Sequence, residues 1–79
     1  METARKELVG ALQKERDERK MNNHTFSTTL LKISESYWSM LRSGDRRFSI
    51  DMLQTILFVF PHLQPQVIAY MKDGDEEAK

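Results

Sequence analysis

Histidine, serine and carboxylate side chains are the residues of this chain that could do acid–base, nucleophilic or metal chemistry. His24 and His62, the two histidines, lie far apart, and no compact set of carboxylates surrounds either one. Ser34, Ser36 and Ser39 have no base nearby in the sequence, the glycines form no phosphate-binding loop, and cysteine is absent. We therefore expect a protein that is not an enzyme, with no metal, no cofactor and no small-molecule substrate.

The most informative stretch covers residues 33–50, which have a polar start, apolar inner positions and a basic exit. Ser34 suits the N-cap of a helix, and Gly44 suits its C-terminal stop. Trp38 and Leu41 are three residues apart and share one face of that helix. The positions around the rest of it are Glu35, Ser36, Ser39, Met40 and Arg42. One face of this helix would pack against the rest of the protein, and the other would be free to contact a partner. This pattern fits a DNA-reading helix and also an ordinary amphipathic helix capped at both ends.

Length and composition set the class of protein. The chain has 79 residues, enough for one small domain with little room for an internal active site. Its first nine residues are polar and charged, unlike a signal peptide, and its longest apolar run, Ile56–Pro61, is too short to span a bilayer. With no cysteine to form disulfides, we expect a soluble, cytoplasmic protein that does not contact membranes.

Charge is balanced in total but unevenly placed. Twelve basic residues match twelve acidic ones, so a case for nucleic acid rests on where the charges sit. Two clusters of basic residues precede the acidic end. The first consists of Lys14, Arg16, Arg19 and Lys20, and the second of Arg42, Arg46 and Arg47. The acidic residues crowd the C-terminus, at Asp73, Asp75, Glu76 and Glu77. Without that end, the body of the chain is basic.

Apolar residues recur at helical spacing and predict an all-α, compact five-helix bundle without a sheet. The expected helices cover about 3–20, 25–32 and 35–43, then a fourth from Ser49 to Pro61 and a fifth from about Pro65 to Asp73 and Gly74. Residues 1–72 would form the domain, and residues 73–79 an acidic, disordered tail. A domain cut from a longer regulator is a further option, although Met1 and the polar end favour a complete small protein.

A set of residues with a distinctive joint spacing marks the middle of the chain. It consists of Phe26-Ser27 to Leu30, Ile33-Ser34, Trp38, Leu41, Gly44, Phe48-Ser49-Ile50 and Leu53. Over about Leu8 to Leu63, this spacing and the order of helices resemble the helix-turn-helix domains of the phage repressor and Cro family, often called XRE-type. The resemblance implies a lambda-repressor-like fold, with the second helix across the DNA backbone and the third in the major groove.

When the family's positions are aligned on Gly44, the resemblance places base-reading positions at Glu35, Ser36 and Met40, with Ser39 close by. A serine hydroxyl donates or accepts at a base edge, a carboxylate accepts from a cytosine amino group, and a methionine contacts a thymine methyl.

The same carry-over places contacts to the DNA backbone at Asn22 or Asn23, at Ser34, and in the loop with Arg46 and Arg47. Arginine side chains and N-terminal helix amides suit phosphate because they offer charge and directed donors. These contacts would set affinity and its salt dependence.

The chain departs from the family pattern in three ways. The turn region, residues 30–33, carries one extra residue and no glycine. Arg42 stands where the family often has an acidic residue, and Arg16 stands at the expected partner position. Either Glu15 or Asp17 substitutes in that bridge, or Arg42 turns outward to a phosphate. Finally, the first residues of the reading helix include no Gln, Asn or Arg, the usual bidentate base readers.

Several apolar residues near the C-terminal half could lie at a subunit interface. Phe58 falls on the polar side of its helix, so we expect it to be exposed. It could complete a homodimer interface with Ile68, Tyr70 and Met71, since palindromic operators call for a two-fold dimer. A fifth helix folding back over Phe58 would explain the same residues without a partner.

Two functions follow from these patterns. The first is a sequence-specific transcriptional regulator of bacterial or phage type that binds double-stranded DNA as a dimer, for example a repressor. The alternative uses the same fold as a protein-interaction module, antitoxin-like or adaptor, and is favoured by the zero net charge and by Glu35 at a reading position.

Overall fold

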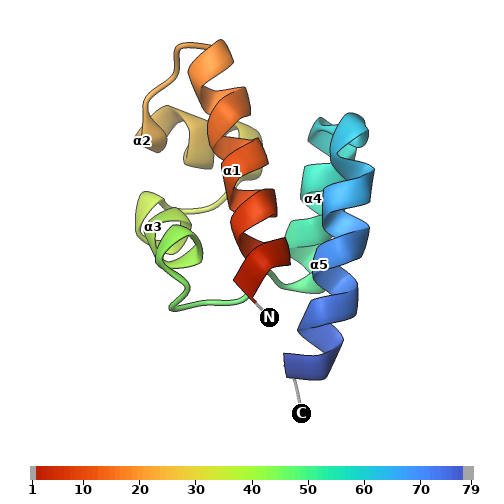
Figure 1. Ribbon diagram of the computed structural model, residues 1–79. Helices are drawn as coiled ribbons and strands as arrows, with labels where there is room; N and C mark the ends of the chain where they lie inside the picture. Colours follow the sequence, from red (N-terminus) through yellow and green to blue (C-terminus); the bar gives the residue numbers. More distant parts are fainter. Residues whose placement is uncertain (1, 78–79) are drawn as a thin grey trace.

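Helices make up most of the described chain (Figure 1). The structure, a computed structural model, describes the backbone of residues 2–77 and the side chains of residues 4–72. The elements are α1 (Glu2–Glu18), α2 (Asn23–Thr25), η1 (Phe26–Leu31), α3 (Glu35–Ser43), α4 (Ile50–Val59), η2 (Pro61–Leu63) and α5 (Gln64–Glu77). The π-helix η1 continues α2, and the 3-10 turn η2 leads into α5. No strand occurs within residues 2–77, so the predicted all-α five-helix architecture is confirmed.

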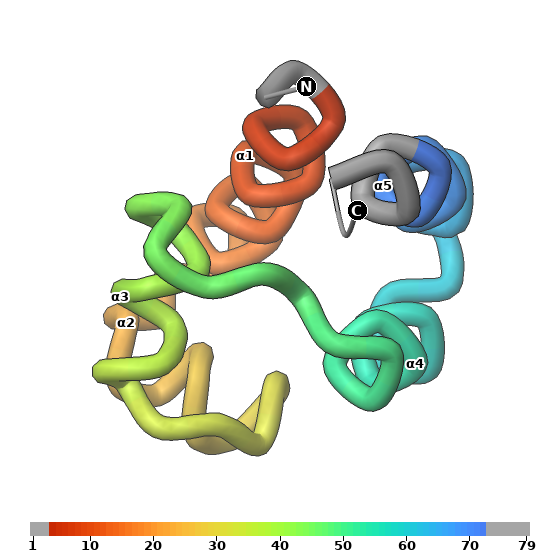
Figure 2. Tube along the Cα trace, turned by 90° about the horizontal axis from the view of Figure 1, so that it is seen from below, coloured from red at the N-terminus to blue at the C-terminus, as the bar shows by residue number. Residues whose placement is uncertain are grey.

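The helices form two groups around α1. α1 and α5 pack side by side and run in opposite directions (Figure 1). Figure 2 shows α2 and α3 on one side of the molecule and α4 with α5 on the other. α3 is therefore far from α5 and reaches the molecular surface.

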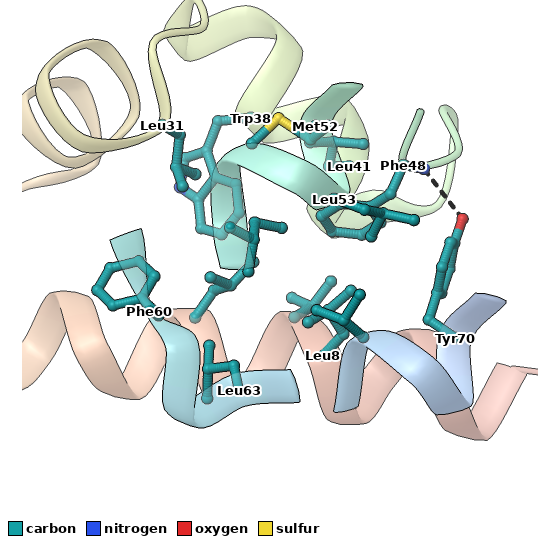
Figure 3. Close-up of a cluster of buried hydrophobic side chains, with 14 of the residues drawn as sticks. Leu8, Leu31, Trp38, Leu41, Phe48, Met52, Leu53, Phe60, Leu63 and Tyr70 are labelled. Carbon is teal, nitrogen blue, oxygen red and sulfur yellow. Dashed lines mark hydrogen bonds between the residues drawn. The ribbon is translucent and has the colours of Figure 1, made fainter. Parts of the chain in front are cut away.

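Apolar side chains from every helical segment except α2 meet in one core (Figure 3). Trp38 and Leu41 of α3 are fully buried, as their shared face predicts. The Trp38 ring lies 5.4 Å from that of Phe26, which stacks in turn on Phe60 at 6.1 Å. Aromatic pairs at such distances are worth about 0.5–1.5 kcal/mol beyond the area they bury. This aromatic row fixes α3 against η1 and the end of α4.

The predicted boundaries hold best at the capped helix ends. α3 spans Glu35–Ser43, and α4 begins at Ile50 with Ser49 as its N-cap, as expected. α1 ends at Glu18 because the chain turns at Lys20, where φ is 56°. The expected stop of the last helix at Asp73 and Gly74 is wrong.

The backbone of α5 continues as helix to Glu77, through most of the segment predicted to be a disordered tail. A glycine inside a helix costs only about 1 kcal/mol, which does not force an end. Residues 78 and 79 lie outside the described residues.

Tyr70 belongs to the core, which corrects its assignment to a dimer interface. Its side chain is 3% exposed, and its hydroxyl accepts a hydrogen bond from the backbone N–H of Phe48 at 2.9 Å (Figure 3). The Phe48 ring meets the Tyr70 ring edge-on, with centroids 5.2 Å apart. Tyr70 therefore holds the α3–α4 loop onto α5 and is not available to a partner.

Candidate nucleic-acid interface

Residues at both ends of α3 cap the helix. The Ser34 hydroxyl accepts from the backbone N–H of Tyr37 at 3.1 Å, which satisfies a donor of the first turn. At the other end Gly44 has φ 92°, and its N–H donates to the carbonyl of Met40 at 3.1 Å. A Cβ at Gly44 would lie 3.2 Å from the guanidinium carbon of Arg5. Glycine is needed here both for the left-handed backbone and for space.

The guanidinium of Arg5 reinforces this C-terminal end from α1. Its Nη1 donates to the carbonyl oxygen of Arg42 at 3.3 Å. Positive charge at a helix C-terminus is favourable because the last carbonyls carry partial negative charge. The position of α3 thus depends on α1 as well as on its own caps.

A polar link under α3 joins three helices. Asn23 Oδ1 accepts from the indole Nε1 of Trp38 at 3.0 Å and from Nη1 of Arg16 at 2.6 Å. The Oδ1 atom of Asn23 is thereby engaged within the fold, and the predicted contact of Asn22 or Asn23 with the DNA backbone stays a prediction. Asn22 lies at the surface and caps α2, with Oδ1 accepting from the backbone N–H of Thr25 at 2.7 Å.

The predicted base-reading residues lie on the outer side of α3. Glu35, Ser36 and Ser39 are exposed, and Met40 is half-buried. Ser43, which was not among the predicted base-reading residues, extends the same polar side toward the C-terminal end of α3. Hydroxyl groups therefore dominate this surface, and they can donate and accept hydrogen bonds without adding charge to that of Glu35.

Glu35 is paired with His24, a residue that the sequence did not predict at this surface. The Nδ1 atom of His24 lies 3.5 Å from Oε1 of Glu35, and both side chains are exposed. His24 lies on α2, so this contact joins the second helical segment to the start of α3. Only the fold brings these two residues together.

The extra residue of the turn is absorbed by the π-helix. A π-helix has i→i+5 hydrogen bonds and accommodates one more residue than an α-helix over the same length. Lys32 then takes a left-handed conformation at φ 62°, and its N–H donates to the carbonyl of Ser27. A lysine thus occupies the backbone conformation that glycine commonly provides at a helix end. Its side chain is exposed beside the start of α3.

Arg42 does not turn outward, and neither Glu15 nor Asp17 pairs with it. Its guanidinium lies over the Trp38 ring, 5.5 Å from the centroid, while its buried Nε has no hydrogen-bond partner among the described residues. Asp17 pairs with Arg16, and Glu15 pairs with Arg19 and His62. Arg42 is therefore a half-buried packing residue in this structure, and its contact with the DNA backbone stays a prediction.

The loop after α3 carries the exposed arginines. Arg46 and Arg47 both lie at the surface, between Gly44 and the N-cap Ser49. The Asp45 side chain is exposed beside them. Arg19 lies elsewhere, with its guanidinium 4.9 Å from the centroid of the Phe60 ring. The exposed positive charge near α3 consists chiefly of Lys32, Arg46 and Arg47.

The remaining predicted interface residues are exposed to different degrees. Phe58 is 88% exposed, whereas Ile68 and Met71 on α5 are 43% and 40% exposed. Phe58 borders a groove formed by η1 and α4, to which α5 contributes no residue. The fifth helix therefore does not fold over Phe58.

Comparisons with known proteins give no relative for this chain. No family model matches it, and neither the curated proteins nor the solved structures include a significant match. Within the described part of the chain, no group of three or more His, Cys, Asp or Glu side chains is placed to hold a metal ion. None of the described helices has the length and apolar character needed to cross a membrane.

Proposed function

We propose that this chain is a sequence-specific DNA-binding transcriptional regulator of bacterial or phage type, with α3 as the helix that enters the major groove. The observation that carries the proposal is the two-sidedness of α3. Its Trp38 side is locked into the core, while its Ser36 and Ser39 side is exposed and polar. A major groove admits one α-helix, and exposed hydroxyl groups suit its base edges.

Positive side chains just after α3 supply the phosphate contacts in this proposal. Arg46 and Arg47 follow the C-terminal end of the helix and are exposed. Exposed cations gain affinity by releasing counterions from DNA, whatever the net charge of the whole protein. The zero net charge of the chain therefore does not argue against binding.

A two-fold dimer completes the proposal. Two copies of α3 would then read half-sites about one helical turn, roughly 34 Å, apart.

Selection from a randomised DNA library, followed by anisotropy titrations across a salt series, tests this function. We expect log Kd to depend on log salt, with a slope that falls by about 1 for each phosphate contact removed. The double substitution Arg46→Ala/Arg47→Ala should weaken binding to all sequences alike. Lys14→Ala/Lys72→Ala is the matched control, because it removes two exposed charges from α1 and α5. Undetectable binding at low salt, or equal effects of the two double variants, would reject the proposal.

The second candidate function is a protein-interaction module, favoured by the exposed Phe58 ring and the groove beside it. A stoichiometric protein partner that co-purifies with a chain lacking affinity for DNA would decide for this function. The salt series separates the two candidates, since only the first requires binding to DNA.

A further inference from the structure

An open groove lies between η1 and α4. It has a volume of about 660 Å³. Its η1 side includes Leu30 and Lys32, and its α4 side includes Asp51, Thr55, Phe58 and Val59. Leu30 and Val59 are half-buried and give the groove an apolar lining. Its volume falls within the range of about 300–1,000 Å³ that is typical of small-molecule pockets, so one phenyl ring would fill only part of it.

The most exposed large apolar side chain among the described residues borders this groove. Phe58 is 88% exposed, although it lies within a regular helix whose other face is buried. Asp51, Thr55 and Phe58 recur at helical spacing, so they form one stripe of α4 along the groove. A phenylalanine ring on such a stripe can insert into a facing groove but cannot fill its own.

We propose that this groove is the homodimer interface, with Phe58 of a second copy inserted into it. In a two-fold interface both partners use the same surface patch. That patch must therefore contain both the protruding side chain and the groove that accepts it. The patch around Phe58 contains both. This interface excludes Tyr70 and does not involve Ile68 or Met71.

The charges at the groove are also self-complementary. Lys32 and Asp51 both line it, one on each side, and neither forms an ion pair with another described residue. The charges of these two side chains sum to zero, so the patches of two copies can face each other without net charge repulsion. A strongly acidic or basic partner would gain nothing from this neutral patch.

The size of the patch predicts a weak dimer. Each phenylalanine ring contributes about 150–250 Å² of buried surface, and specific interfaces usually bury at least about 1,200 Å² in total. Two rings cover a minor part of that area, so the flanking stripe must supply the rest. We therefore expect dissociation constants in the micromolar range, about 1 μM to 1 mM.

Sedimentation equilibrium of the full chain without DNA tests the interface over that concentration range. We expect a monomer–dimer equilibrium whose dissociation constant rises at least about tenfold in Phe58→Ala. Ile50→Ala is the matched control, because Ile50 is a 59% exposed apolar residue of α4 that does not line the groove. Thermal unfolding should show that both variants remain folded, since both side chains are exposed.

Charge reversal provides a second, independent readout. Asp51→Lys places excess positive charge in both facing patches and should dissociate the dimer, whereas Lys32→Glu/Asp51→Lys restores neutrality and should recover it. A monomeric wild type up to about 1 mM would overturn the proposal. So would a dimer that survives Phe58→Ala and is lost in Ile68→Ala/Met71→Ala. This interface rests on the two-fold dimer of the proposed function, but none of these measurements requires DNA, so a failure of the interface can be told apart from a failure of DNA binding.

Discussion

The indole N–H of Trp38 donates to the side-chain oxygen of Asn23, with Nε1 and Oδ1 3.0 Å apart. Trp38 is fully buried, so no water can replace this acceptor. The same oxygen accepts from Arg16, and one carboxamide thus links α1, α2 and α3. The orientation of the candidate reading helix depends on this atom.

Asn23→Ala should destabilise the fold by about 1–3 kcal/mol, because it leaves a buried indole donor without a partner. Asn23→Asp keeps an acceptor beside Arg16 and should lose less. Urea unfolding monitored by the single tryptophan measures both variants. As a control, Gln54→Ala changes an exposed residue of α4 and should stay within about 0.5 kcal/mol of wild type. An Asn23→Ala value within that margin would contradict the assigned role.

Helix caps and the buried face of α3 could be predicted from the sequence because they depend on neighbouring residues. Ser34, Gly44 and Ser49 set helix ends through hydrogen bonds or backbone angles within one turn. Trp38 and Leu41 follow from periodicity alone. The fold class and the limits of α3 therefore agree with the prediction.

The structure departs from the sequence prediction at contacts between residues that are distant in the sequence. The resemblance places a DNA-backbone contact at Asn22 or Asn23, yet the fold turns Oδ1 of Asn23 toward Trp38. Tyr70 is predicted at an interface with Phe58, yet its hydroxyl meets the backbone of Phe48. The π-helix, by contrast, had a signal, since the turn was one residue too long for a regular helix and carried no glycine.

Two glycine substitutions should act in opposite directions. Gly44→Ala should destabilise the protein by about 1–2 kcal/mol through the left-handed backbone alone, and the contact with Arg5 adds to this cost. Gly10→Ala, inside α1 with no atom within 4 Å of the added Cβ, should stabilise it by about 0.5–1 kcal/mol. Thermal unfolding of the pair measures the difference. If both substitutions shifted the melting temperature in the same direction, the conformation assigned to Gly44 would be contradicted.

Stability should decline in acid partly through Glu15. The hydrogen bond with His62, whose Nε2 lies 2.6 Å from Oε2, lowers the pKa of Glu15 below its ordinary value of 4.5. Burial of the carboxyl opposes this shift and Arg19 adds to it. Because the folded pKa is the lower one, the carboxylate contributes stability above pH 4.5, and the contribution is lost as pH falls through the folded pKa.

Glu15→Gln should therefore be less stable than wild type at neutral pH, with a difference that shrinks below pH 4.5. Urea unfolding of both proteins between neutral and acidic pH provides the measurement. Glu7→Gln is the control, because it changes an exposed carboxylate on the same helix. A difference for Glu15→Gln that stays constant across this range would show that the carboxylate charge is not responsible.

If α3 reads DNA, Glu35 should disfavour binding in general and select for one base in particular. Its carboxylate, held beside His24, repels phosphate but can accept from a cytosine amino group. Glu35→Gln should raise affinity for all sequences at low salt and change the preferred base at one position from cytosine to adenine, by about 1 kcal/mol or more. Selection from a randomised library with each protein measures both effects. Glu18→Gln removes an exposed carboxylate from α1 instead, and an equal gain in affinity with an unchanged base preference would show that Glu35 does not face a base.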